Sequence, residues 1–265
     1  WELEEYFQQV WNLEVCKPFH NDEGLAQKEK VKEQRALLEE RYVQLKEKAP
    51  ELFDMEWDYV QHTYEAGSIR LISNPTEIYA KEPVVFYKLV QLMKEAGERV
   101  VIQSPYVVCN AYMCEQLTSL KEAVPDVKIL LNSVENGDNF VASSDYLRNK
   151  DKILNTGIPL YEYDGGISNH AKSILIDDDL SVIGSYNLDL RSSYLDTELM
   201  LVVESRELNQ ELGGYMEEME ADSRRALPDG TYEVPEHVTV EEVPFWKRAA
   251  WSVVGFLLQP FRMLV

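Results

Sequence analysis

Short β-branched runs that alternate with longer amphipathic segments constrain the fold of this chain more than any other feature. The runs that read as strands cover residues 69–72, 99–103, 127–131, 158–161 and 199–203. Helical periodicity covers residues 84–96, 111–123, 142–155 and 207–220. Strands that alternate with helices form a sheet whose two faces are both covered. The sequence therefore predicts an α/β fold with helices on both faces of the sheet.

Three segments are expected along the chain. Residues 1–62 are predicted to be a helical linker segment, residues 63–226 the sheet domain, and residues 227–265 a C-terminal tail. In the first segment, a second helix is expected from about Leu25 to Lys48, ending before Pro50. The first helix carries an apolar stripe, which consists of Leu3, Phe7, Val10 and Trp11.

The tail contains an apolar stretch at residues 245–261 that is interrupted by a narrow polar stripe. The stripe consists of Arg248, Ser252, Gly255 and Gln259. The predicted helix is too short to cross a hydrocarbon core of ~30 Å, and its aromatic and basic residues suit a membrane surface. In that interpretation Trp246, Trp251 and Phe256 insert at the headgroup boundary, and Lys247, Arg248 and Arg262 meet anionic lipid. The alternative is a terminal helix docked on a partner domain.

Charge and cysteine content limit the classes of protein to which this chain can belong. The chain has 26 basic and 47 acidic residues, a net charge of −21, and shows no basic patch of the kind that nucleic-acid binding requires. Cys16, Cys109 and Cys114 make an odd number without metal-ligand spacing, which indicates reduced thiols in a cytosol-like compartment. A cytoplasmic, peripherally membrane-associated protein is expected. The chain begins at Trp1 and not at Met, which indicates that its true N-terminus is missing.

A predicted hairpin at residues 170–187, HAKSILIDDDLSVIGSYN, carries a group of polar residues at strand spacing. Side chains alternate between the faces of a strand, so His170 and Lys172 share one face, as do Ser185 and Asn187 on the returning segment. An imidazole, an ammonium, a hydroxyl and a carboxamide can therefore converge on one point, which suits a tetrahedral anion. Alone, each of these residues would read as a surface or turn residue, and Asp177 as a turn former. The combined pattern H-x-K-x4-D-x6-G-S-x-N is specific.

This pattern resembles the HKD motif of the phospholipase D superfamily, which comprises phosphodiesterases and phosphatidyltransferases. Residues 187–192 (NLDLRS) and 195–198 (LDTE) are similar to stretches of bacterial cardiolipin synthases, as are 104–106 (SPY), 132–133 (NS) and 160–162 (LYE). The resemblance covers about residues 65–222, and residues 1–18 resemble the linker after a first HKD motif. Departures are Leu190, where proline is usual, and Ser143, where histidine often stands. The resemblance implies a mixed β-sheet flanked by helices on both faces.

The resemblance also implies roles for residues. One motif's histidine attacks phosphorus to give a phosphohistidine, and the other motif's histidine, here His170, acts as general acid and base. Lys172 and Asn187 would bind the phosphoryl oxygens, Ser185 would support the pocket, and Glu198 would orient the histidine ring at Nδ1. Asp177 is included among the candidate catalytic residues, although fixing the hairpin suits it better than proton transfer. The candidate substrate-binding residues are Ser104, Tyr106, Asn132 and Arg191.

No metal or other cofactor is expected, because the fixed donors suffice for the phosphoryl group. A second motif must come from elsewhere, since His20, His62 and His237 have no lysine two residues later. The expected partner is the N-terminal HKD half of the same enzyme or a homodimer mate. The expected substrate is a phospholipid, by transfer or by hydrolysis. A nuclease or phosphodiesterase of the same superfamily and a non-catalytic scaffold are the alternatives.

Overall fold

The computed structural model describes residues 1–20, 24–53 and 58–265, and these residues form two compact units. Residues 7–63 form one unit, and residues 1–6 with residues 64–265 form the other, which we call the sheet unit. The C-terminal segment that was expected to be a separate tail therefore belongs to the same compact unit as the sheet.

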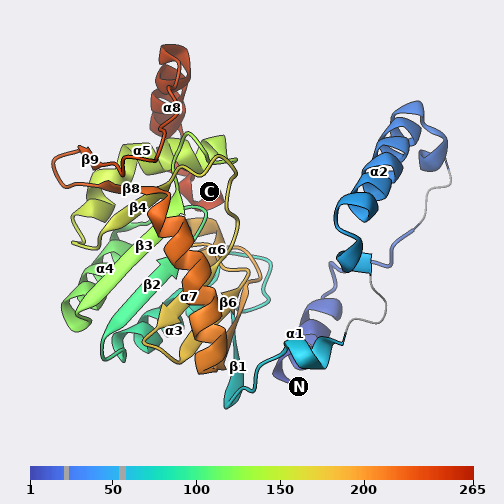
Figure 1. The fold of residues 1–265 in the computed structure, drawn as a ribbon, viewed down its shortest axis with the longest axis horizontal. Coiled ribbons are helices and arrows are strands. Elements are labelled where there is room, and N and C mark those ends of the chain that lie inside the picture. Colours follow the sequence, from blue (N-terminus) through green and yellow to red (C-terminus); the bar gives the residue numbers. More distant parts are fainter. Residues whose placement is uncertain (21–23, 54–57) are drawn as a thin grey trace. The chain divides into compact units, whose positions relative to one another are not determined.

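Nine strands of the described chain form one mixed sheet (Figure 1). In chain order they are β1 (Ser68–Ser73), β2 (Arg99–Gln103), β3 (Asp126–Asn132), β4 (Leu160–Tyr163), β5 (Ser173–Ile176), β6 (Leu180–Gly184), β7 (Leu199–Glu204), β8 (Ser223–Ala226) and β9 (Tyr232–Glu233). Their order across the sheet is β1-β7-β6-β5-β2-β3-β4-β8-β9. Strands β2, β3 and β4 are parallel, and the remaining pairs are antiparallel.

This pairing brings several polar strand ends to one edge of the sheet. Strands β2, β3 and β6 end there, whereas β5 and β7 begin there because they run in the opposite direction. We call this the site edge. Gly184 closes β6 at this edge, where a Cβ on it would meet the Leu199 carbonyl oxygen at 2.2 Å. A glycine is therefore needed for β6 to lie this close to β7.

Helices cover both faces of the sheet, as predicted. The larger core packs α3 (Val84–Lys94), α4 (Ala111–Ala123) and α5 (Phe140–Leu154) on one face. On the other face, Met216 and Met219 of α7 (Arg206–Ala221) pack against Val101, Leu130 and Leu175. Successive strand residues thus point alternately into the two cores, which explains the continuous apolar runs in the central strands.

The predicted elements agree closely with the structure where apolar periodicity is strong, and α4 and β2 have the predicted bounds. Three short elements were not predicted: α6 (Leu190–Tyr194), β8 and β9. Helix α6 begins where the Asp189 carboxylate accepts the backbone N–H of Ser192 at 2.7 Å. Strand β8 has the sequence Ser-Arg-Arg-Ala, and its two charged residues lack the β-branched and apolar character by which strands are recognised.

The C-terminal helix α8 (Phe245–Leu257) docks on α5 along one narrow face. Trp251 is 3% exposed and stacks on Phe140, and a Cβ on Gly255 would meet the Ser144 carbonyl oxygen at 2.5 Å. The prediction that Trp251 inserts into a membrane is therefore wrong. Gly255 belongs to the buried face and not to a solvated stripe, because its missing side chain lets the two helices approach.

Beyond α8, the chain continues as a 3-10 helix, Gln259–Leu264. Within it, Arg262 donates to both oxygens of the Asp145 carboxylate, at 2.6 and 2.9 Å, and to the Cys109 carbonyl oxygen at 2.9 Å. Because the Asp145 side chain is fully buried, Arg262 neutralises a carboxylate of its own protein. The prediction that Arg262 meets anionic lipid is therefore also wrong.

The N-terminal segment is helical in part, because residues 12–20 form turns and irregular structure. Helix α1 (Glu2–Trp11) is anchored by Tyr6, which is 7% exposed and donates to the Asn74 carbonyl oxygen at 3.1 Å. The predicted stripe is therefore not the buried one, and Leu3, Phe7 and Trp11 are exposed. Helix α2 (Glu29–Lys48) exposes polar residues on all sides. Residues 21–23 and 54–57 of this segment lie outside the described residues. The remaining elements are short 3-10 helices, at Leu25–Gln27, Pro50–Phe53 and Tyr59–His62.

Candidate active site

The motif residues gather at the site edge from three strands. His170 and Lys172 directly precede β5, Ser185 follows β6, and Glu198 directly precedes β7. The Lys172 carbonyl oxygen accepts the backbone N–H of Gly184 at 3.2 Å, which continues the β5–β6 ladder to the edge. Strand pairing thus sets the His-x-Lys segment beside the Gly-Ser segment.

The His170 imidazole has a contact at each ring nitrogen. Lys172 Nζ lies 2.5 Å from Nδ1, and it also donates to the His170 carbonyl oxygen at 2.6 Å. Because an ammonium is a donor, Nδ1 must accept, and the neutral ring then carries its proton on Nε2. On that side the Tyr106 hydroxyl lies 3.2 Å from Nε2. The expected bond between Glu198 and His170 Nδ1 is absent from the described contacts, because Lys172 occupies that position.

Glu198 lies in the site, but it contacts hydroxyl groups. Its carboxylate accepts a short hydrogen bond from Ser185 Oγ and a 2.8 Å bond from Ser192 Oγ. Burial is the main cause that raises the pKa of Glu198, and the two serine hydroxyls oppose it. Burial also lowers the pKa of Lys172, and the negative charge of Glu198 opposes that shift. Glu198 therefore stabilises the ammonium across the site and positions Ser185.

Asn187 presents a carboxamide that is only partly used by the protein. Its backbone N–H and its Nδ2 donate to Ser192 Oγ at 3.3 and 3.4 Å. Its Oδ1 is buried and has no hydrogen-bond partner among the described residues. Buried polar atoms are nearly always paired in native structures, so this acceptor oxygen is an exception within the described chain, as are four other buried polar atoms. Ser192, which the sequence reasoning missed, ties Asn187 to Glu198.

Two of the candidate substrate-binding residues serve the protein itself. Asn132 is 4% exposed and holds Asn169 by two bonds, from Nδ2 to the carbonyl oxygen at 2.8 Å and from the Asn169 N–H to Oδ1 at 2.9 Å. It thereby fixes the residue that precedes His170. Ser104 is 2% exposed, donates to the Tyr106 carbonyl oxygen and accepts the Leu188 N–H. Both residues position the site, because their polar atoms are already bonded within the protein.

Tyr106 and Asp138 form a second arm of the site. The Tyr106 hydroxyl donates to Asp138 Oδ1 at 2.6 Å while it lies beside His170 Nε2. Burial, followed by this hydrogen bond, raises the pKa of Tyr106 far above its usual range, so the phenol stays protonated. The sequence reasoning missed Asp138. The sequence feature that could have identified Asp138 is its place in the loop after β3, since loops at the carboxyl ends of parallel strands commonly carry site residues.

Arg191 and Asp177 lie outside this group. The Arg191 guanidinium is exposed and pairs with Asp196 at 3.0 Å. Asp177 lies at the other end of β5 from His170, where its carboxylate accepts the backbone N–H groups of Gly97, Glu98 and Arg99 at 2.9–3.0 Å. Its φ of 52° is a left-handed conformation that aspartate tolerates. The predicted catalytic role of Asp177 is therefore not supported by its position, and the residue fixes the turn.

We expect Asp177→Ala to lower the free energy of unfolding by about 1–3 kcal/mol, because three backbone donors lose their acceptor. Turnover of the assembled enzyme should not change. Burial opposes ionisation of Asp177, but the three N–H groups outweigh it and lower its pKa. The stability that its carboxylate contributes is thus present above its unfolded-state pKa and is lost as the pH falls through its folded-state pKa. Urea denaturation at several pH values measures this.

Asp178→Ala is the matched control, because that neighbouring side chain is 61% exposed and makes a surface ion pair with Arg206. Loss of turnover in Asp177→Ala at unchanged stability would instead return Asp177 to the catalytic group.

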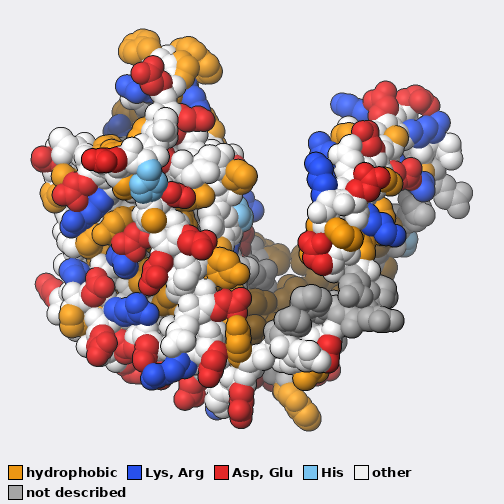
Figure 2. All heavy atoms as spheres, viewed as in Figure 1, with side chains coloured by type: hydrophobic (Ala, Val, Ile, Leu, Met, Phe, Trp, Pro, Cys, Tyr) orange, Lys and Arg blue, Asp and Glu red, His pale blue; other side chains and the backbone are white. Residues whose placement is uncertain are grey.

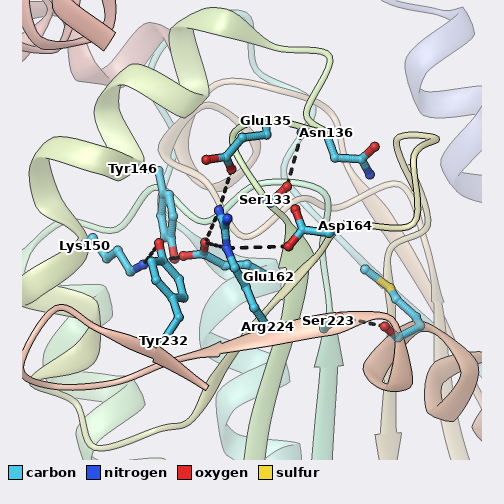
Figure 3. A network of polar contacts seen from close by, with 11 residues as sticks. Ser133, Glu135, Asn136, Tyr146, Lys150, Glu162, Asp164, Ser223, Arg224 and Tyr232 are labelled. Carbon is cyan, nitrogen blue, oxygen red and sulfur yellow. Dashed lines mark hydrogen bonds and ion pairs between the residues drawn. The ribbon is translucent and has the colours of Figure 1, made fainter. Parts of the chain in front are cut away.

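A buried charge network holds the strand and loop that adjoin the site (Figure 3). Arg224 of β8 points toward Glu162 of β4 at 3.1 Å, toward Asp164 at 3.6 Å, and makes a short contact with Glu135. Glu162 also accepts from Lys150 Nζ at 2.5 Å and from the Tyr146 hydroxyl at 2.6 Å. Because Glu135 and Asp138 share the loop between β3 and α5, the network anchors the loop that carries Asp138.

The part of the chain that the structure describes contains no group of three or more His, Cys, Asp or Glu side chains that could hold a metal ion.

Comparison with known proteins assigns the family. Residues 89–220 match the family model for "Cardiolipin synthase, PLD-like domain". Cardiolipin synthase A from Yersinia pseudotuberculosis and from Yersinia pestis are each 30% identical to this chain over 151 residues. The chain therefore belongs to the phospholipase D superfamily through a PLD-like domain, with distant similarity to cardiolipin synthase A over about half of its length. That match covers 56% of this chain and 30% of each relative.

Several solved structures are similar to this chain, among them the following two. Nuc from Salmonella typhimurium, a phospholipase D family member, aligns with a TM-score of 0.48 and 20% identity, covering 60% of this chain and 97% of that one. Phosphatidylserine synthase from Haemophilus influenzae aligns with a TM-score of 0.49 and 19% identity, covering 75% of this chain and 48% of that one.

Proposed function

We propose that this chain supplies one of two HKD motifs to an enzyme that transfers or hydrolyses the phosphodiester of phospholipids. The observation that carries the proposal is the convergence of His170, Lys172, Ser185 and Asn187 at one sheet edge. The similarity of the domain to cardiolipin synthases supports the phospholipid as substrate.

The geometry supports a division of roles in this reaction. A histidine of the second motif attacks phosphorus, and the P–O bond to the leaving alkoxide breaks while His170 Nε2 gives that oxygen a proton. His170 then takes a proton from the incoming alcohol or water, whose oxygen displaces the phosphohistidine nitrogen. Lys172 and the Asn187 amide donate to the non-bridging oxygens. One histidine cannot hold the phosphoryl group and exchange the proton, so a second motif, from the N-terminal half or a second copy, is required.

Charge favours a lipid over a nucleic acid as the substrate. Phosphate contacts by Lys and Arg dominate the affinity for nucleic acids, and this chain has a net charge of −21. A phospholipid headgroup presents one or two phosphates and does not require an extended basic surface.

The test is to assay the complete protein, with both motifs, on phosphatidylglycerol vesicles and to identify products by mass spectrometry. Cardiolipin indicates transfer, and phosphatidic acid indicates hydrolysis. Single-stranded DNA and RNA serve as parallel substrates. Cleavage of nucleic acid without a lipid product would replace the proposal with a nuclease, and inactivity on all substrates would favour a scaffold.

We further propose that α8 holds this enzyme on a membrane surface through the face turned away from α5. Large apolar side chains along this face and the following turn are exposed, namely Phe245, Trp246, Val253, Leu257 and Phe261. Phe256 is exposed as well, although its ring also contacts the Arg148 guanidinium of α5, at 5.3 Å from the ring centroid. Figure 2 shows hydrophobic side chains gathered at the end of α8 that projects from the domain. Residues 245–265 contain three basic and no acidic residues, unlike the rest of this acidic chain. Within the described chain, every helix is too short or too polar to cross a bilayer.

The position of α8 suits this role. Its Trp251 packs on Phe140, two residues beyond Asp138, which bonds Tyr106 beside His170. The helix is thus attached at the site edge, and a lipid surface that contacts its free face would lie on the side of the domain where the motif residues gather.

We expect Trp246→Ser and Phe256→Ser each to weaken sedimentation with phosphatidylglycerol vesicles by roughly ten-fold, since burying a large apolar side chain contributes at least about 1.5 kcal/mol. Activity on a short-chain soluble phosphodiester should persist. Trp11→Ser, at another exposed tryptophan, is the control. Unchanged vesicle binding in both α8 variants would instead assign the face to a protein partner. Deleting the tail would be a poorer test, because it removes Arg262 from the buried Asp145 carboxylate.

A further inference from the structure

An open pocket of about 510 Å³ lies apart from the motif residues, beside the first turns of α3 and α4. It is lined by three tyrosines, a proline, a valine and one carboxylate: Tyr87, Tyr112, Tyr194, Pro83, Val84 and Glu82. Its size and its mostly apolar lining, with few polar groups, are typical of small-molecule sites.

The walls of this pocket are fixed to one another. The backbone N–H of Lys81 donates to the Tyr194 carbonyl oxygen at 2.7 Å, and the Asn110 amide donates to the Tyr194 hydroxyl at 3.0 Å. Tyr112 meets the buried Phe86 ring edge-on, with centroids 6.0 Å apart. A ligand would therefore enter a formed pocket without having to order these side chains, which favours binding.

The carboxylates of Glu82 and Glu115 lie near the phenols of the pocket. Burial is the main cause that raises the pKa of Tyr112, followed by the neighbouring phenols Tyr194 and Tyr87 and then by the carboxylates Glu115 and Glu82. Burial lowers the pKa of Lys81, and the negative charges of Glu77, Asp196 and Glu198 oppose that shift. The charge of Lys81 is therefore balanced by carboxylates other than that of Glu82. The faces of aromatic rings attract cations, and cages of aromatic side chains are the usual recognition site for quaternary ammonium ligands.

We propose that this pocket binds an alkylammonium group. The carboxylate at its rim complements the positive charge, and the tyrosine rings complement the alkyl substituents, whereas an uncharged apolar ligand would leave Glu82 partly desolvated. This inference goes beyond the proposed phosphodiester chemistry, and its test does not depend on activity.

The experiment is a titration of the complete chain with tetramethylammonium chloride at constant total chloride, followed by ligand-observed proton NMR. A parallel titration uses tert-butanol, which has a similar shape and no charge. We expect the cation to bind several-fold more tightly than the alcohol. Tyr87→Leu should weaken cation binding roughly two- to five-fold, the equivalent of a cation–π contact at an exposed site, whereas Tyr87→Phe should not. Glu82→Gln should weaken it as well.

Tyr215→Leu is the control, because this tyrosine is 62% exposed on α7, away from the pocket. Circular dichroism checks that each variant is folded, and Tyr87 is itself exposed enough to be replaced without disturbing the core. Equal affinity for the cation and the alcohol would overturn the proposal, as would equal losses in Tyr87→Leu and Tyr215→Leu.

Discussion

Replacing His170 with alanine in the complete two-motif enzyme is expected to lower turnover by roughly 10²- to 10⁴-fold, the range that positioned acid–base groups contribute. The ring is exposed, so the free energy of unfolding should change by less than about 0.5 kcal/mol. Turnover is measured on a soluble phosphodiester, which removes any effect of membrane binding, and stability is measured by urea denaturation.

His237→Ala is the matched control, because this imidazole is also exposed and its contact with Asp222 lies on the surface. We expect it to keep full activity. If His170→Ala retains more than a few per cent of turnover, His170 is not the general acid. Tyr106→Phe separates the two arms of the site, since it removes the hydroxyl beside His170 Nε2 and keeps the ring.

Replacing Arg224 with alanine is expected to lower the free energy of unfolding by about 3–5 kcal/mol, the largest loss of stability that we predict. The guanidinium is 4% exposed, and its removal leaves the buried Glu162 carboxylate with Lys150 as its remaining cation. Burial raises the pKa of Glu162, but the charges of Lys150 and Arg224 outweigh it and lower the pKa. The stability that this carboxylate contributes is thus present above its unfolded-state pKa and lost as the pH falls through its folded-state pKa.

The adjacent residue provides the control. Arg225 pairs with Glu233 at 3.3 Å, with side chains that are 43% and 61% exposed, so Arg225→Ala should cost less than about 1 kcal/mol. Urea denaturation of both variants at neutral pH gives the comparison. Equal losses would mean that the network in Figure 3 stabilises the fold no more than a surface pair does.

Local chemistry explains how much of the fold could be predicted. Apolar periodicity marked α4 and β2 at their observed bounds, and the acidic turn at Asp178 and Asp179 marked the hairpin of β5 and β6. Strand β8 could not be recognised, because Arg224 faces buried carboxylates that lie about sixty and ninety residues away in sequence. For α8, periodicity gave the helix, but Gly255 faces α5 because of close packing that the helix alone does not reveal.

In the candidate site, too, local spacing could be predicted from the sequence and contacts between distant residues could not. Spacing within the hairpin indicated that His170, Lys172, Ser185 and Asn187 lie at one edge, since they flank two paired strands. The roles of Asn132 and Asp138 depend on contacts with residues 32 to 37 positions away, Tyr106 and Asn169. Those contacts decide which polar groups are hydrogen-bonded within the protein and which remain free to bind a ligand.

Gly184 acts as a spacer between two strands, with consequences for how mutations in the motif are interpreted. Any side chain there would push β6 away from the Leu199 carbonyl oxygen. The next residue, Ser185, donates to Glu198 and receives the Leu199 N–H at 3.1 Å, so the displacement would separate both pairs. A Gly184 variant should therefore be inactive although glycine has no reacting group. A mutational scan that scores activity alone would count this position among the catalytic ones, and a stability measurement on the same variants would separate it from them.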